Sequence, residues 1–227
     1  IWPRGKEMMI ALPNLDGSFT VTCFWLPKTF DALQQPDDIK SYFESTYPDA
    51  IPVMPTYVSD FASNPTSPLG TVHCSMFHHG STAALLGDAA HAIVPFYGQG
   101  MNAGLQGALQ LARAMQSHHS IREALEAYDT IHRPDATAIA NLALSNYVEM
   151  RSHTASAMWR LRTRLEKQLN RLFPKRYRPI YNLVSFSTVR YSEAVEIAMQ
   201  QQRRLLISMV MATLLVIGGL VALGTMA

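Results

Sequence analysis

The chain has 227 residues, of which 48% are hydrophobic and 16% are charged, with 19 lysines and arginines against 17 acidic residues. This length is enough to bury a hydrophobic core, which excludes a small scaffold held together by disulfides or metal ions. A net charge of +2 gives no dense basic field, which argues against nucleic-acid binding. The charged fraction is well below the roughly 25% of ordinary soluble domains, so some part of the chain must be strongly apolar.

The first predicted elements are two strands, Glu7–Leu12 and Phe19–Leu26, which are rich in apolar and β-branched residues. Asn14, Asp16 and Gly17 between them predict a hairpin connection at the edge of a mixed sheet. No element before Glu7–Leu12 is expected to pair with it. Because the chain also begins with an isoleucine rather than a methionine, we expect a fragment of a longer protein.

Short helices and strands are expected next. Pro36 and the two following aspartates are typical of a helix start, and a second short helix is predicted over Tyr57–Ala62. Beyond a loop rich in proline and serine, Thr71–Phe77 and Ala83–Leu86 are both expected to be strands.

Nearly everything after Met101 predicts helix. Ser120 and Glu123 have capping-box spacing for a helix that reaches Arg133, and a break or kink is expected at Pro134. A long helix is predicted over Asp135–Phe173. Basic residues are dense between 160 and 178, where a solvated helix face and contact with anionic lipid headgroups are both reasonable interpretations.

The C-terminal run Leu205–Ala227 contains no charge and no proline. A helix over these residues would be roughly 34 Å long, enough to cross a hydrocarbon core of about 30 Å. A buried core helix is the alternative, but such helices usually keep a polar stripe. Arg203 and Arg204 precede the run, so by the positive-inside rule the rest of the chain is expected to face the cytosol. We therefore predict a transmembrane tail anchor in contact with membrane lipid.

Candidate chemistry concentrates in the stretch GDAAHAIVPFYGQGMNAG, residues 87–104. Asp88 closes an apolar segment, and an ionised carboxylate there accepts hydrogen bonds, for example from sugar or polyol hydroxyls. Gly87 lets a ligand approach the backbone closely. Further on, Gly98 and Gly100 precede a predicted helix whose first amides are free donors and whose dipole stabilises an anion.

Gly98, Gly100 and Ala103 also satisfy the spacing of the dinucleotide-binding fingerprint. That fingerprint requires a preceding hydrophobic strand and an acidic residue about 20 positions later. Proline and two aromatic residues precede it here, and the nearest acid, Glu123, lies in a predicted helix. We therefore reject this interpretation.

Taken together, GDAAHA followed by PFYGQGMNAG resembles the second FAD-binding motif of the aromatic-ring flavoprotein monooxygenases. Further segments of the chain, such as HCSMFHH and LSNYVEMRSH, are similar to members that act on L-kynurenine. The resemblance implies an enzyme that uses FAD, NADPH and O2 to hydroxylate the ring of L-kynurenine at the mitochondrial outer membrane. It implies an α/β fold that contains part of the substrate-domain sheet, the second half of the FAD site, a helical C-terminal region and one transmembrane helix.

The family's pattern also assigns site residues. The expected cofactor-binding positions are Gly87, Asp88, Pro95, Gly98, Gly100, Met101 and Asn102. The expected substrate-binding positions are Phe96, Gln99, Asn146 and Tyr181. No catalytic side chain is expected, because the cofactor carries out the difficult step. No metal site is expected either, because the cluster of His73, Cys74, His78 and His79 has no second group of ligands at finger-like spacing.

The predicted domain division is residues 1–70 as part of the substrate-binding sheet domain, 71–118 as the C-terminal part of the FAD-binding domain, 119–200 as a helical domain and 205–227 as the anchor. Where the family usually has acidic residues after MNAG, this chain has Gln106 and Gly107. The family's N-terminal βαβ unit is also missing, so this stretch alone is not expected to hold FAD tightly. The alternatives are a flavin monooxygenase for another aromatic acid and a non-catalytic, tail-anchored membrane protein with a decayed flavin motif.

Overall fold

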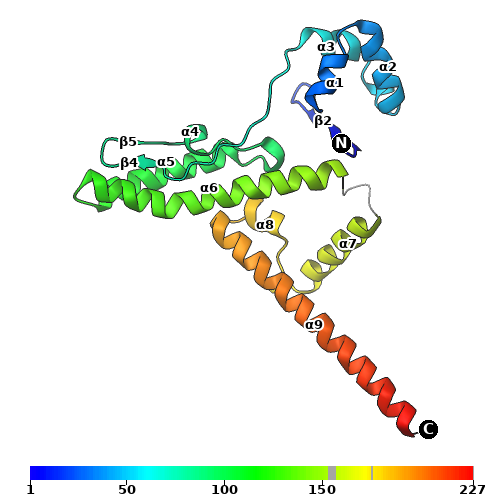
Figure 1. Cartoon of the computed structure of the whole chain (residues 1–227), viewed down its shortest axis with the longest axis vertical. Helices are drawn as coiled ribbons and strands as arrows, with labels where there is room; N and C mark the ends of the chain where they lie inside the picture. The colour runs from blue at the N-terminus through cyan, green and yellow to red at the C-terminus, as the bar shows by residue number, and fades with distance from the viewer. Residues whose placement is uncertain (153–156, 175, 227) are drawn as a thin grey trace. The chain divides into compact units, whose positions relative to one another are not determined.

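The computed structural model describes residues 1–152, 157–174 and 176–226, leaving out the side chains at 152, 157–160, 162, 209 and 212–226. It divides into two compact units (Figure 1). The first unit comprises Ile1–Gly70 and Ala143–Thr163, and the second comprises Thr71–Leu142 and Arg164–Ala227. The domain division expected from the sequence remains a prediction.

An antiparallel sheet opens the first unit, in the order β1 (Trp2–Arg4), β2 (Glu7–Pro13) and β3 (Phe19–Phe24). The predicted hairpin is confirmed, and Gly17 adopts a positive φ of 84° in its turn. The expectation that nothing precedes and pairs with β2 was wrong. Trp2 pairs with Met9 across a tight turn, because Gly5, at a φ of 77°, reverses the chain within two residues.

Short helices complete the core of this unit: α1 (Pro27–Ala32), α2 (Pro36–Thr46), η1 (Ile51–Val53) and α3 (Tyr57–Ser63). The predicted helices after Pro36 and at Tyr57 are confirmed. Trp25 lies at the centre of an aromatic cluster, where its ring stacks on Tyr47 and its Nε1 donates to the Tyr47 hydroxyl at 2.9 Å. This unit therefore has a hydrophobic core of its own.

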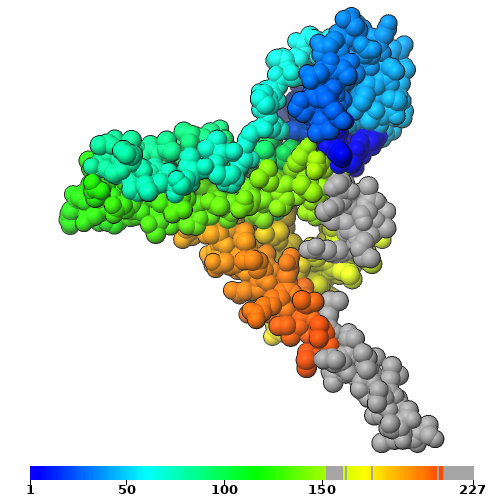
Figure 2. Space-filling view, viewed as in Figure 1, coloured from blue at the N-terminus to red at the C-terminus, as the bar shows by residue number. Residues whose placement is uncertain are grey.

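The second unit begins with irregular chain and the two-stranded sheet of β4 (His78–His79) and β5 (Ala83–Ala84). The expected strand over Thr71–Phe77 was wrong, and the expected strand at Ala83–Leu86 is reduced to β5. The Phe77 amide donates to the Asp129 carboxylate at 2.8 Å, so it is not available to a strand ladder. Phe77 also packs against Tyr128 of α6, and Figures 1 and 2, drawn from one viewpoint, show this part of the chain over the helices of the second unit.

Helices dominate from Asp88 onward, in the order α4 (Asp88–His91), η2 (Pro95–Tyr97), α5 (Gly100–Ser117), α6 (Ile121–Ser152), α7 (Ala157–Leu172), α8 (Ile180–Ser185) and α9 (Tyr191–Met226). The predicted cap is confirmed, because the Glu123 amide donates to Ser120 Oγ at 3.2 Å. A kink stays a prediction, but the break predicted as its alternative at Pro134 was wrong. The helix continues through it, and the exposed Ile131 carbonyl near the proline accepts a hydrogen bond from Arg190.

Of the long helix predicted over Asp135–Phe173, the structure shows the second part of α6 and then α7, which ends at Leu172, whereas residues 153–156 between them lie outside the described residues. The helix predicted near Met101 is confirmed as α5. Residues 205–226 of the predicted transmembrane run Leu205–Ala227 belong to α9, whereas residue 227 and most of the side chains of the run lie outside the described residues. Within the part of the chain that the structure describes, no helix is both long enough and apolar enough to span a membrane.

Candidate functional site

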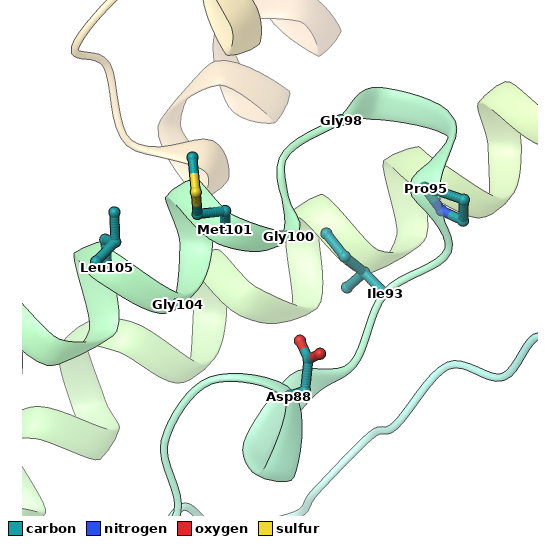
Figure 3. Close-up of a pocket in the computed structure, with 8 residues that line it drawn as sticks. All are labelled: Asp88, Ile93, Pro95, Gly98, Gly100, Met101, Gly104 and Leu105. Atoms are coloured by element: carbon teal, nitrogen blue, oxygen red, sulfur yellow. The ribbon is translucent and has the colours of Figure 1, made fainter. Parts of the chain in front are cut away.

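A depression of about 510 Å³ lies between α4 and the start of α5 (Figure 3). It is lined by Asp88, Ile93, Pro95, Gly98, Gly100, Met101, Gly104 and Leu105. The predicted carboxylate and the predicted glycine-rich helix start therefore face one space. Asp88 is exposed, and Figure 3 shows its carboxylate pointing toward the beginning of α5.

Two glycines bring the elements of this site close together. Gly87 precedes α4 with a φ of 58° and a ψ of −139°, a conformation that side chains rarely tolerate. A Cβ added to Gly104 of α5 would lie 3.7 Å from the Gly87 Cα. This part of α5 therefore runs close to the loop that carries Asp88, and Gly87 provides the backbone conformation of that loop.

The N-terminus of α5 offers unpaired backbone donors. Gly98 has a φ of 66°, in the left-handed region, and turns the chain from η2 into the helix. Gln99 occupies the N-cap position but makes no side-chain capping hydrogen bond. The first amides of α5 are therefore available to a ligand, and the dipole of this 18-residue helix adds partial positive charge there.

Gln99 itself is buried and held in place rather than lining the depression. Its Oε1 accepts hydrogen bonds from Asn102 Nδ2 and from the Tyr191 hydroxyl, both at 3.0 Å. Tyr191 begins α9, so this contact ties α9 to the start of α5. Asn102, predicted to contact the cofactor through its backbone, is exposed beside this bond.

Behind the site, two buried histidines support α4. His91 Nε2 and His132 Nε2 are 3.0 Å apart. Burial lowers the pKa of His91, and burial together with the neighbouring His91 lowers the pKa of His132 to about 4. Both rings are thus favoured in the neutral form, in which one nitrogen can donate to the other.

Among the predicted substrate residues, Phe96 is buried in η2, while Tyr181 of α8 is half exposed. The Tyr181 ring lies 5.8 Å from the ring of Tyr97 and 5.9 Å from that of Phe186, measured between centroids. An aromatic cluster therefore links α8 to η2, the turn that precedes α5.

Asn146, the remaining predicted substrate residue, lies in α6 within the first unit, where its Nδ2 donates to Met150 Sδ at 3.5 Å. Its role toward a ligand stays a prediction, as do those of Tyr181, Phe96 and Gln99. Sequence reasoning missed Ile93, Gly104 and Leu105 as lining residues. Gly104 carried a usable signal, since it follows Gly100 by four residues and so shares one face of the helix with it.

The chain matches a protein-family model described as an FAD binding domain over residues 31–143. It is 43% identical over 202 residues to kynurenine 3-monooxygenase of Flavobacterium psychrophilum, which covers 87% of this chain and 45% of the relative. It is 38% identical over 228 residues to kynurenine 3-monooxygenase of Sus scrofa, which covers 99% of this chain and 47% of that protein. The chain thus spans about half the length of the curated relatives it matches.

The fold also has a counterpart among solved structures. The tetrameric form of 2-methyl-3-hydroxypyridine-5-carboxylic acid oxygenase aligns with a TM-score of 0.50 and 21% identity, over 67% of this chain and 40% of that one. This likeness concerns the fold alone. Together with the sequence matches, it agrees with the flavin hydroxylase architecture expected above. The chain belongs to the kynurenine 3-monooxygenase family of FAD-dependent aromatic monooxygenases.

Proposed function

We propose that this chain forms the C-terminal part of an enzyme that hydroxylates L-kynurenine to 3-hydroxykynurenine with FAD, NADPH and O2. The observation that carries the proposal is the single depression that places the Asp88 carboxylate opposite the free amides at the start of α5. Identities of 38–43% to kynurenine 3-monooxygenases support the choice of substrate.

The residues of the depression suit FAD. An exposed carboxylate accepts hydrogen bonds from the hydroxyls of a ribityl chain, and free amides at a helix N-terminus suit the carbonyl and anionic edge of a flavin ring. Gly100 and Gly104 line the depression without a side chain, so they leave its wall on α5 open to a ligand. Pro95 and Gly98 shape the turn on which those amides depend.

Bound FAD would supply the redox chemistry, in which NADPH provides electrons and O2 provides the inserted oxygen atom. The chain's own residues would hold and shield the reactants. Asp88 would fix the cofactor from one side, and the amides of Met101 and Asn102 from the other. Buried Phe96 and the neighbouring aromatic rings would help to exclude water from the substrate.

For the amino-acid end of the substrate we propose Asn146 and Tyr181, since an amide and a phenol can both donate to a carboxylate. Gln99 would act close to the aminoaryl ketone. The carboxamide Oε1 already accepts two hydrogen bonds, so any contact that Gln99 makes with substrate would use its NH2 group as a donor.

We also propose that Leu205–Ala227 anchors the protein in the mitochondrial outer membrane with the enzyme on the cytosolic side. The support is the uncharged sequence of the run and the preceding Arg203 and Arg204. Resistance of the protein to alkaline extraction from mitochondria would test the anchor.

The enzyme proposal is tested on the natural protein that carries this chain, purified in mild detergent. We expect bound flavin and NADPH oxidation stimulated by kynurenine, with 3-hydroxykynurenine as the product. Asp88→Ala should lower the affinity for FAD about 10- to 100-fold, because it removes a charged hydrogen-bond acceptor. Asp31→Ala, at an exposed position of α1, is the matched control and should leave the affinity unchanged.

The remaining outcomes separate the alternatives. A flavin-containing protein that does not respond to kynurenine would indicate another aromatic substrate. A folded protein that binds no flavin would contradict the enzyme proposal and favour a non-catalytic membrane protein.

A further inference from the structure

The C-terminal half of α7 and the loop after it present cations and apolar side chains together on the surface of the second unit. The exposed cations are Arg164, Lys167, Arg171, Arg176 and Arg178. The exposed apolar side chains are Leu165 (56% exposed), Leu172 (66%) and Phe173 (51%). We call these eight residues the basic apolar surface.

The two kinds of side chain follow neighbouring stripes of the helix. Leu165, Leu169 and Leu172 recur at spacings of four and three residues, which places them on one face. Arg164 and Arg171 each precede a leucine of that stripe by one residue, so they flank the apolar face. An apolar stripe bordered by basic residues is typical of helices that lie in the plane of a membrane interface.

Hydrogen bonds fix this surface to α9. Asn170 Nδ2 donates to the Tyr177 carbonyl at 2.7 Å, which closes the loop against the end of α7. Buried Gln201 of α9 then holds Arg178 from both sides, because its Oε1 accepts from the Arg178 amide at 2.6 Å and its Nε2 donates to the Arg178 carbonyl at 3.1 Å.

The hydrogen bonds between Gln201 and Arg178 place the basic apolar surface near the start of the uncharged run of α9. Gln201 is followed by Arg203 and Arg204, and the uncharged run begins at Leu205, four residues or about 6 Å along the helix. Of the side chains that the structure describes between positions 205 and 211, the exposed ones are apolar apart from Ser208: Leu206 (63%), Ile207 (52%), Val210 (50%) and Met211 (54%). The basic apolar surface thus lies where the uncharged part of α9 begins.

We propose that the basic apolar surface rests in the headgroup layer of an anionic lipid bilayer, with Leu165, Leu172 and Phe173 reaching the acyl boundary. The cations would bind acidic headgroups, and the tail would insert beside them. An acidic protein partner would account for the charges, but not for apolar side chains exposed next to the uncharged run. The inference rests on the membrane anchor proposed above, but it is independent of the proposed enzyme activity.

The test uses the full chain in vesicles, with the polarity-sensitive dye NBD on Phe173→Cys. Cys74→Ser and Cys23→Ser remove the two partly exposed native thiols, so that the dye reacts at position 173. We expect a blue-shifted emission, quenched by brominated lipid, when the vesicles contain phosphatidylserine, and a weaker effect in pure phosphatidylcholine. Dye on Glu126→Cys, at an exposed position of α6 in the second unit, is the control and should report water in both lipids.

Neutralising three cations in Lys167→Gln/Arg171→Gln/Arg176→Gln should weaken docking in phosphatidylserine vesicles about 100-fold, at about fivefold per cation. Alkaline extraction of the same vesicles reports the anchor separately. Extraction of the chain would overturn the anchor and this inference with it. If the chain resists extraction but the dye at position 173 stays in water, the proposed membrane contact of the basic apolar surface is overturned, while the anchor is not. Equal docking in both lipids, or no loss in the triple variant, would also overturn that contact.

Discussion

Behind the candidate site, the His132 ring occupies the space that a side chain at position 107 would need, and that residue is a glycine. A Cβ at this position would lie 2.6 Å from His132 Nε2, and that ring is packed against Tyr128 and His91. We expect Gly107→Ala to lower the free energy of unfolding by about 1 to 2 kcal/mol, because overpacking outweighs the gain in helix propensity. Urea unfolding of the purified protein in detergent measures this change.

Gly104→Ala is the matched control in the same helix. Its Cβ would make only an ordinary contact, 3.7 Å from the Gly87 Cα, so the substitution should stabilise the protein by up to about 1 kcal/mol. If Gly107→Ala were as stable as Gly104→Ala, the His132 ring would not be confined as described.

The His91–His132 pair predicts a pH dependence of stability. Burial lowers the pKa of both rings, that of His132 to about 4, whereas an unfolded histidine titrates near 6.5. Below the unfolded pKa the unfolded chain therefore binds more protons than the folded one. The two neutral histidines therefore contribute fully to the stability of the fold above about pH 6.5, and this contribution is lost as the pH falls toward 4.

His132→Gln removes one titrating ring and should flatten this slope between pH 6.5 and 4. Urea midpoints of the parent and the variant at several pH values provide the measurement. A parallel dependence in both proteins would show that His132 does not carry the effect.

Site residues that belong to one short sequence motif could be predicted from the sequence. Contacts between residues that are distant in the sequence could not. Asp88, Gly98 and Gly100 lie within one short stretch, and the structure places them around one depression. In the sequence, Gly107 stood out only as a departure from the acidic residues that the family usually has after MNAG. The contact that requires a glycine there comes from His132, a residue on another helix, which no local pattern reveals.

At the scale of elements, Asp135 joins α6 to the first turn of α9. The buried carboxylate accepts hydrogen bonds from Arg190 Nε at 2.9 Å, from the Ser192 amide at 3.1 Å and from the Ser192 hydroxyl. It also places a negative charge at the positive end of the helix dipole. The same helix carries Tyr191, which holds Gln99 at the start of α5.

Asp135→Ala should therefore lower the free energy of unfolding by about 2 kcal/mol, because several hydrogen bonds lose their acceptor. Glu196→Ala, at an exposed position of α9, is the control and should change it by less than about 0.5 kcal/mol. Thermal unfolding followed by circular dichroism compares the two. Equal stability of both variants would contradict this role for Asp135.

Local sequence patterns were enough to predict which long segments are helices. Where elements end or fail to form depends on contacts with residues that are distant in the sequence. The cap at Ser120 and the helix after Gln99 needed only nearby residues. Thr71–Phe77 has the composition of a strand, but the Phe77 amide donates its hydrogen bond to the Asp129 carboxylate of α6. Pro134 would ordinarily end a helix, yet α6 continues through it while Arg190 binds a carbonyl near that point.

At the scale of the whole molecule, each unit has its own hydrophobic core, and the first crossing between the units is an exposed segment. Residues 64–70 are all exposed and contain no helix or strand, whereas α3 ends before them at Ser63. All residues that line the depression lie beyond this segment, in the second unit. Cleavage within it should therefore leave the lining of the depression intact.

We expect a broad-specificity protease at low concentration to cut first within residues 64–70, since exposed backbone outside regular structure is the preferred site of nicking. Mass spectrometry of the early fragments identifies the cut. Because the segment contributes nothing to the depression, its cleavage rate should be the same with and without added FAD. A first cut within α5, or strong protection of residues 64–70 by FAD, would contradict this division of the chain.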